Sequence, residues 1–91
     1  MTIEIQTRII NRLGLHARAA TQLVNCASEF QAAVFLKLGE RQVNGKSIMG
    51  VLMLAAAFGS TITLEIRGDD QDAAMEALVE LVESGFGELA Q

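Results

Sequence analysis

Four short segments of the chain alternate apolar and polar residues, which is the pattern of a β-strand with one buried face. The segments are residues 3–9, 34–38, 41–43 and 61–67. In the first segment, the residues expected to face the core are Ile3, Ile5, Thr7 and Ile9. Only Gly39 and Glu40 separate the two middle segments. Because glycine readily adopts the positive φ of a tight turn, we expect these two strands to form a hairpin.

Three other segments carry apolar residues at helical spacing. The first begins near His16, the second follows Ser47 and ends by Gly59, and the third follows the turn at residues 68–70. The apolar series are Ala19, Ala20, Leu23, Val24, Ala27 and Phe30 in the first, Ile48, Met49, Val51, Leu52, Leu54 and Ala55 in the second, and Ala73, Ala74, Ala77, Leu78, Leu81 and Val82 in the third. Ser47 is a favourable N-cap residue. The acidic residues of the 68–70 turn suit the positive end of the third helix.

The expected elements follow the order β-α-β-β-α-β-α, and each has one apolar side. The economical way to bury all these sides is a single sheet with every helix on one face. The predicted fold class is therefore α+β, and the short strands and split β-α-β order are compatible with an antiparallel sheet. The opposite face of the sheet is expected to meet water through Glu4, Arg8, Lys37, Glu65 and Arg67.

Composition and charge exclude several function classes. The 91 residues suffice for one domain, spanning 1–91, and 51% of them are apolar. The net charge is −4 and the seven basic residues are scattered, so we expect no nucleic-acid partner. One cysteine, Cys26, excludes an intramolecular disulfide, and one histidine with one cysteine cannot form a Cys/His zinc site. No metal or cofactor is expected, and the apolar stripe around Cys26 favours a buried, unreactive thiol.

The N-terminal and apolar segments bear on where the protein works. Residues 1–6 alternate in polarity and include Glu4, so they lack the basic start and continuous apolar core of a signal peptide. The best apolar run, residues 48–58, is short and interrupted by Gly50, so we expect no membrane insertion. These observations favour a cytoplasmic protein, which we expect to be a monomer.

His16 is the only histidine, and it follows Gly14 at the expected start of a helix. The first turn of a helix offers unpaired N–H groups and partial positive charge, which together bind anions. Imidazole is a good nucleophile near neutral pH, and the nearby Arg18 could reach the same anion. The set combines a nucleophilic ring, an anion-binding helix end and a guanidinium group. The alternative is a surface histidine at a helix start with no functional role, and the residues by themselves leave this alternative open.

A second group of candidate functional residues surrounds Ser47. On its own, Ser47 is most simply an N-cap that is followed by core residues. In the alternative interpretation, the helix exposes a small apolar docking patch made of Ile48, Met49 and Leu52. Ser47 is then a modification site at the rim of that patch, where a phosphate changes its electrostatics.

Two stretches of the chain resemble motifs of a known family. The stretch Leu13-Gly14-Leu15-His16-Ala17-Arg18-Ala19-Ala20 resembles the active-site motif of the HPr family, the histidine-containing phosphocarriers of the bacterial phosphoenolpyruvate-dependent phosphotransferase system. The block Gly45-Lys46-Ser47-Ile48-Met49-Gly50-Val51 resembles the regulatory serine motif of that family. Length and element order match too, so the resemblance covers nearly the whole chain. It implies an open-faced β-sandwich, in which a four-stranded antiparallel sheet lies under three helices.

The resemblance also implies roles for three residues. His16 is expected to accept a phosphoryl group on Nδ1 from phospho-enzyme I and to donate it to the A domains of sugar permeases. Arg18 is expected to assist this transfer. Ser47 is expected to be phosphorylated by the HPr kinase/phosphorylase where that regulator exists. Such a protein is a carrier in a relay and not an enzyme in its own right.

The match departs from the family pattern in one place and leaves the branch open. Ala19 stands where the family usually has proline, which we expect to alter the preorganisation of the phosphate site slightly without loss of function. Residues 46–51 look like the kinase-regulated carriers, whereas residues 81–88 look like the nitrogen-related branch. A purely regulatory module that binds partners without relaying phosphoryl groups is a further alternative. The presence of both His16 and Arg18 argues against it.

Overall fold

The computed structural model, which describes residues 1–88, has the element order that the sequence pattern predicts. The strands are β1 (Thr2–Arg8), β2 (Ala33–Leu38), β3 (Arg41–Asn44) and β4 (Thr61–Arg67). The helices are α1 (Ala17–Ser28), α2 (Ile48–Leu54) and α3 (Gln71–Glu83), and a short 3₁₀ helix, η1 (Gly85–Gly87), follows α3. No helix within residues 1–88 is long and apolar enough to cross a membrane.

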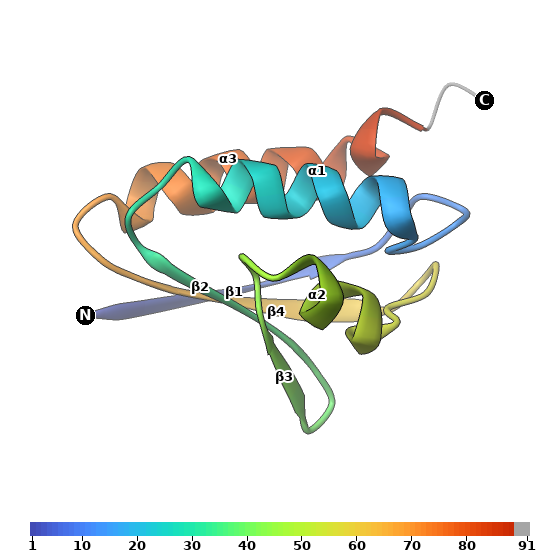
Figure 1. Ribbon diagram of the computed structural model, residues 1–91, viewed down its shortest axis with the longest axis horizontal. Coiled ribbons are helices and arrows are strands. Elements are labelled where there is room, and N and C mark those ends of the chain that lie inside the picture. The colour runs from blue at the N-terminus through green and yellow to red at the C-terminus, as the bar shows by residue number, and fades with distance from the viewer. Residues whose placement is uncertain (89–91) are drawn as a thin grey trace.

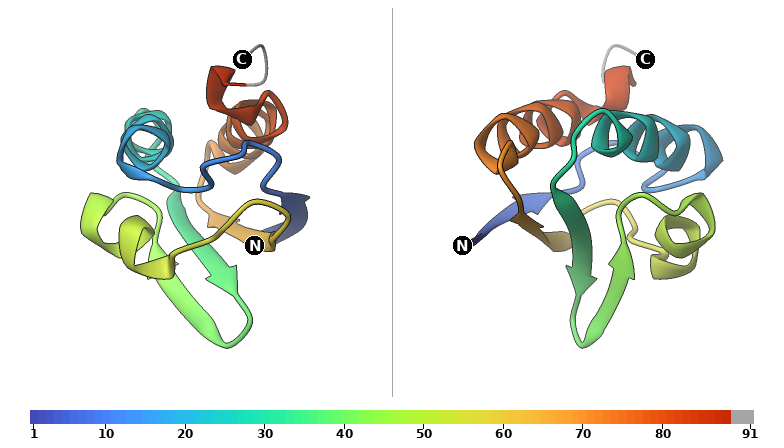
Figure 2. Two further views of the ribbon diagram at one scale, coloured as in Figure 1. Left: turned by 90° about the vertical axis from the view of Figure 1, so that its right-hand side faces the viewer. Right: turned by 60° about the vertical axis from the view of Figure 1, so that its left-hand side comes forward.

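The four strands form one antiparallel sheet in the order β1-β4-β2-β3. The register places Leu64 of β4 opposite both Ile5 of β1 and Leu36 of β2, so these apolar residues share one face. Helices α1 and α3 lie side by side across that face, and α2 packs beside them near β2 and β3 (Figures 1 and 2). The α+β class and the open-faced sandwich of four strands and three helices are therefore confirmed.

The core lies between the apolar face of the sheet and the three helices. Its largest fully buried side chains include Ile9, Leu23, Leu36, Leu54, Ile62, Leu64, Ile66 and Leu78. Burial of each such side chain contributes about 1.5–3 kcal/mol to folding. The helical stripe expected in α1 is confirmed, because its buried residues are Ala19, Ala20, Leu23, Val24 and Ala27.

One residue of β1 and one residue of α3 that were expected in the core are exposed instead. Ile5 is 40% exposed, because β1 is an edge strand with a neighbour on one side only. Ala73 is exposed because the buried stripe of α3 is narrower than expected and follows Ala74, Leu78 and Val82 at intervals of four residues.

Helix α2 ends earlier than the sequence pattern suggests. It stops at Leu54, and Ala55 then adopts a left-handed backbone with φ of 56°. We expected the segment to continue towards Gly59, but the chain has already turned four residues earlier. The positive φ expected for the hairpin glycine is confirmed, since Gly39 has φ of 61°.

The acidic turn before α3 contacts the residues that lead into β2. The Asp70 side chain does not cap α3, and its carboxylate accepts hydrogen bonds from the backbone N–H groups of Gln31 (2.8 Å) and Ala32 (2.9 Å). These bonds, with that from Gln31 the strongest cause, hold the pKa of Asp70 below its usual range. Asp70 therefore ties the start of α3 to the residues that lead into β2.

The open face of the sheet is polar, as expected. Lys37 on β2 pairs with Glu65 on β4 at 3.0 Å and approaches Glu4 on β1 at 3.9 Å. The hydrogen bond to Glu65 raises the pKa of Lys37. Cys26, expected to be buried, is only half-buried, and its partial burial raises the pKa of the thiol.

Candidate functional site

The loop between β1 and α1 holds His16 in a defined place. It is anchored to the loop after α2, because the Leu15 N–H donates to the Ala56 carbonyl at 2.9 Å. Gly14 makes this approach possible: its φ is +65°, and a Cβ atom there would lie 2.6 Å from the Ala56 carbonyl oxygen. A residue with a side chain at position 14 would therefore push the two loops apart.

His16 is the N-cap residue of α1. Its backbone is extended, with φ of −75° and ψ of −179°, and its carbonyl accepts the first helical hydrogen bond from Ala20 at 2.8 Å. No side chain of the described residues caps this helix. The first-turn N–H groups of Ala17, Arg18 and Ala19 thus lack the partners that a cap provides, and they can bind an anion. Because position 19 is alanine and not proline, it keeps its N–H.

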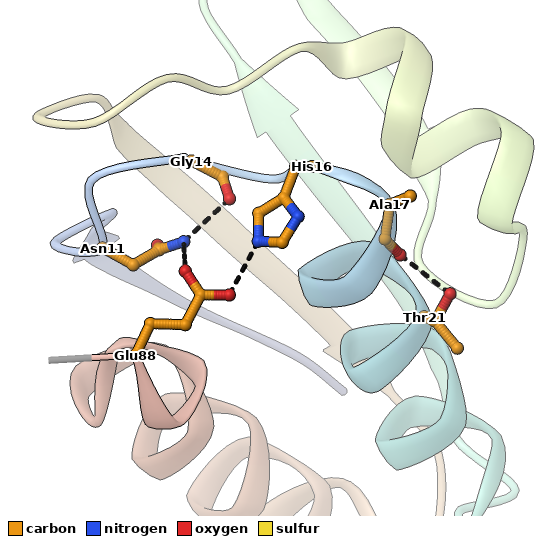
Figure 3. Close-up of polar contacts among 6 residues, drawn as sticks. All are labelled: Asn11, Gly14, His16, Ala17, Thr21 and Glu88. Carbon is orange, nitrogen blue, oxygen red and sulfur yellow. Dashed lines mark hydrogen bonds and ion pairs between the residues drawn. The ribbon is translucent and has the colours of Figure 1, made fainter. Parts of the chain in front are cut away.

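The imidazole of His16 contacts a residue from the segment after α3. Its Nε2 atom lies 2.6 Å from Oε2 of Glu88. The other oxygen of the same carboxylate, Oε1, accepts a hydrogen bond of 3.0 Å from Nδ2 of the buried Asn11. Asn11 Nδ2 also donates to the Gly14 carbonyl at 2.8 Å (Figure 3). The loop between β1 and α1, the start of α1 and the segment after α3 therefore meet at His16.

The charge of Glu88 determines which ring nitrogen is free. The hydrogen bond from His16, followed by that from Asn11, holds the pKa of Glu88 below its usual range, and the nearby Arg18 charge acts in the same direction. An ionised carboxylate only accepts hydrogen bonds, so Nε2 must carry the proton. In a neutral imidazole Nδ1 then has the lone pair, and Figure 3 shows this nitrogen turned away from Glu88 towards the start of α1. The arrangement provides a nucleophilic nitrogen beside an anion-binding helix end.

Arg18 lies in the first turn of α1 and is exposed. It forms no ion pair with any residue in the described part of the chain. Its guanidinium group is therefore available to an incoming anion near His16. The sequence prediction that placed both residues at one helix start agrees with this geometry.

Ser47 is the N-cap of α2, as expected. Its Oγ accepts a hydrogen bond of 3.0 Å from the Gly50 N–H, and the residue is half-buried. Among residues 1–88, no hydrogen bond or ion pair joins Ser47 to His16 or Arg18. Ser47 thus belongs to the neighbouring helix and not to the imidazole site itself.

The first residues of α2 are exposed, and the interpretation that places all of them in the core is wrong. Ile48 is 43%, Met49 67% and Leu52 36% exposed, whereas Val51 and Leu54 on the other side of α2 are buried. The docking-patch interpretation had left out three further exposed apolar residues on this helix and the two neighbouring loops. We call the whole set the apolar patch: Leu13, Ile48, Met49, Leu52, Met53 and Phe58.

Three residues of this region were not identified from the sequence, namely Met53, Glu88 and Asn11, and the reasons differ. Met53 had a local signal, because it follows Met49 by four residues and shares its helical face. Glu88 and Asn11 had none, since 72 residues separate Glu88 from His16 and 77 separate it from Asn11. Within the described residues no group of three or more His, Cys, Asp or Glu side chains could hold a metal ion.

Comparison with known proteins gives consistent matches over most of the chain. Residues 3–84 match the family model described as the PTS HPr component phosphorylation site. The phosphocarrier protein HPr of Cupriavidus necator is 51% identical over 86 residues, which cover 94% of this chain and 97% of that protein. The phosphocarrier protein NPr of Shewanella violacea is 48% identical over 86 residues, covering 94% of each.

A solved structure also agrees with the fold. The crystal structure of an HPr from Thermoanaerobacter tengcongensis superposes with a TM-score of 0.92 at 42% sequence identity. The match covers 94% of this chain and 97% of that one. The similarity therefore extends to the arrangement of the elements around His16 as well as to the sequence.

Proposed function

Because this chain belongs to the HPr family of phosphotransferase-system phosphocarriers, we propose that it accepts a phosphoryl group on Nδ1 of His16. The donor in this proposal is phospho-enzyme I, and the acceptor is the A domain of a phosphotransferase-system permease. The carrier works as a monomer in the cytoplasm and uses no cofactor.

The observation that carries the proposal is the contact between His16 and Glu88. With Nε2 held at 2.6 Å by the carboxylate, the Nδ1 lone pair is the one free to attack. In the transfer, a bond forms between Nδ1 and the phosphorus while the bond to the donor breaks, and its electron pair leaves with the donor. The reverse exchange with the next protein regenerates the free imidazole.

The transferring group carries negative charge that must be stabilised. The uncapped first turn of α1 directs N–H groups at this position, and the exposed Arg18 offers several donors in a fixed fork. Such electrostatic positioning is the main contribution that proteins make to phosphoryl transfer. We assign Arg18 to this role.

The apolar patch is the proposed contact surface for enzyme I and the A domains. It lies on α2 and the adjoining loops, next to the loop that holds His16, since Leu15 is bonded to Ala56. Ser47 lies at its rim, immediately before Ile48 and Met49. Phosphorylation of Ser47 by an HPr kinase/phosphorylase adds about −1.5 to −2 charges at neutral pH. Desolvating that charge on docking is costly, so the modification acts as a brake.

A second candidate is phosphoryl flow in the nitrogen-related branch, which serves regulation. Residues 81–88 resemble that branch, and one relative of 48% identity is named NPr and not HPr. The chemistry at His16 is the same in both candidates, and only the partners differ. A purely regulatory module has less support, because it needs neither the free Nδ1 nor Arg18.

The test is incubation with phosphoenolpyruvate and enzyme I, followed by measurement of the intact mass before and after mild acid. We expect a mass increase of one phosphoryl group that disappears in acid, since a phosphoramidate is acid-labile and a serine phosphate is not. The increase should be lost in His16→Ala and kept in Ser47→Ala. Parallel reactions with the enzyme I of each branch separate the two candidates. Transfer to a His16→Ala chain would overturn the proposal.

A further inference from the structure

We infer that Glu88 is a positioning residue that holds His16 in its Nε2–H tautomer, and that the buried Asn11 is the residue that holds Glu88 in place. The inference rests on the proposed role of His16 as phosphoryl acceptor and adds two residues to that site. Neither contacts the transferring group in this scheme. Both act through the imidazole.

The first argument is that both oxygens of one carboxylate are held. Oε2 of Glu88 lies 2.6 Å from His16 Nε2, and Oε1 accepts from Asn11 Nδ2 at 3.0 Å. The Glu88 side chain is only 11% exposed. A carboxylate fixed at both oxygens cannot rotate freely, so the contact sets the orientation of the ring as well as the position of its proton.

The second argument comes from the amide of Asn11, which is fully buried. Its two N–H donors are both used, one to the Gly14 carbonyl at 2.8 Å and one to Glu88. The reversed amide orientation would place an oxygen against two acceptors, so only one orientation is feasible. In that orientation Oδ1 is buried without a hydrogen-bond partner among residues 1–88. Burying an oxygen without a hydrogen-bond partner costs free energy. The same amide group offsets this cost because Nδ2 donates both of its hydrogen bonds within the site.

The third argument is the backbone that brings Glu88 to the ring. Gly85, Phe86 and Gly87 have φ angles of 65°, 56° and 77°, so three consecutive residues are left-handed. This conformation is unfavourable for a phenylalanine, yet Phe86 is 97% buried, since its exposed fraction is 3%. Burial of its ring in the core fixes the reversal after α3. The segment is therefore anchored by Phe86 and ends in the contact of Glu88 with His16.

The consequence is chemical. A histidine without an orienting partner distributes its proton between both nitrogens and rotates about its side-chain bonds. A molecule with the proton on Nδ1 has no lone pair on that nitrogen and cannot accept a phosphoryl group there. Loss of Glu88 should therefore reduce the competent fraction and disorder the ring, and we expect transfer to slow by roughly tenfold, the lower end of the loss seen when a metal-bound histidine loses its hydrogen-bond partner.

The experiment uses the full chain and two variants, Glu88→Ala and Asn11→Ala. The matched controls are Glu83→Ala, an exposed carboxylate of α3, and Asn25→Ala, an exposed amide of α1. The ¹⁵N chemical shifts of the His16 ring, recorded where the imidazole is neutral, report the tautomer without any transfer reaction. Rates of phosphorylation by phospho-enzyme I then separate kcat from KM.

We expect one tautomer, Nε2–H, in the unsubstituted chain and in both controls. Both variants should populate Nδ1–H and lower kcat, with KM nearly unchanged. Wild-type ¹⁵N shifts in Glu88→Ala would overturn the inference, and this variant decides alone if Asn11→Ala does not fold. If the tautomer shifts as expected but the unsubstituted chain accepts no phosphoryl group, the proposed function fails while the positioning role stands.

Discussion

The Nε2 atom of His16 and the Oε2 atom of Glu88 lie 2.6 Å apart, although 72 residues separate them in the chain. The two helices explain this proximity. Helices α1 and α3 run antiparallel over the sheet, so the segment after α3 arrives beside the start of α1 (Figure 1). The contact therefore joins the N-cap residue of α1 to the segment that follows α3.

Gly14→Ala should destabilise the fold by about 2–4 kcal/mol, because it combines a left-handed backbone with a clash. The new Cβ would lie 2.6 Å from the Ala56 carbonyl oxygen. Gly39→Ala is the matched control: its φ is +61°, similar to the +65° of Gly14, but nothing lies within 4 Å of its Cβ position. Urea unfolding should show a loss of only about 1–2 kcal/mol for the control. Equal losses would mean that the close approach to Ala56 costs nothing.

Arg18→Ala should slow phosphoryl transfer to His16 by on the order of a hundredfold, since one preorganised charge contact is removed. Docking affinity for enzyme I should change little. Arg67→Ala, an exposed arginine of β4 on the open face of the sheet, is the control and should transfer at the normal rate. The measurement is single-turnover phosphorylation at saturating enzyme I. An Arg18→Ala chain with normal single-turnover rates would assign Arg18 to docking or to no role.

Ser47→Ala and Ser47→Asp should separate the capping role of Ser47 from its regulatory role. Alanine removes the acceptor of the 3.0 Å bond from Gly50 and should cost about 1 kcal/mol of stability. Aspartate retains a cap acceptor, so the fold should keep its stability. Its charge beside Ile48 and Met49 should raise the half-saturating concentration of enzyme I. If Ser47→Asp is folded and has the same half-saturating concentration as the unsubstituted chain, Ser47 is a cap alone.

Asp70 should make the fold sensitive to acid. Its pKa is held below the usual range, chiefly by the Gln31 N–H, so the folded state binds fewer protons than the unfolded state on the acidic side. The carboxylate therefore stabilises the fold above the ordinary aspartate pKa, and this contribution is lost as the pH falls through the lowered value. In Asp70→Asn, the free energy of unfolding should therefore fall less steeply as the pH is lowered. The control is Asp69→Asn, which changes an exposed neighbour and should leave this pH dependence unchanged. The measurement is urea unfolding at several pH values.

The sequence by itself determined which segments become strands and helices and, for most of them, which side is buried. The spacing of apolar residues, every second residue in a strand and every three to four residues in a helix, is a local property of the chain. It does not depend on where the element lies in the fold. The α1 stripe from Ala19 to Ala27 and the N-cap role of Ser47 follow in this way. The same local logic placed His16 and Arg18 at one helix start, because two residues of separation keep them together in any fold.

The tertiary structure decided the features that depend on neighbours distant in the chain. Ile5 has the same alternation as buried residues but is exposed, because β1 lies at the sheet edge. Ile48 and Met49 belong to an apolar series but face outward, because α2 buries its other side. The tautomer that we infer for His16, with its proton on Nε2, depends on the contacts that Glu88 makes with the ring and with Asn11. No local pattern carries that information, since such contacts arise only when packed helices bring distant segments together.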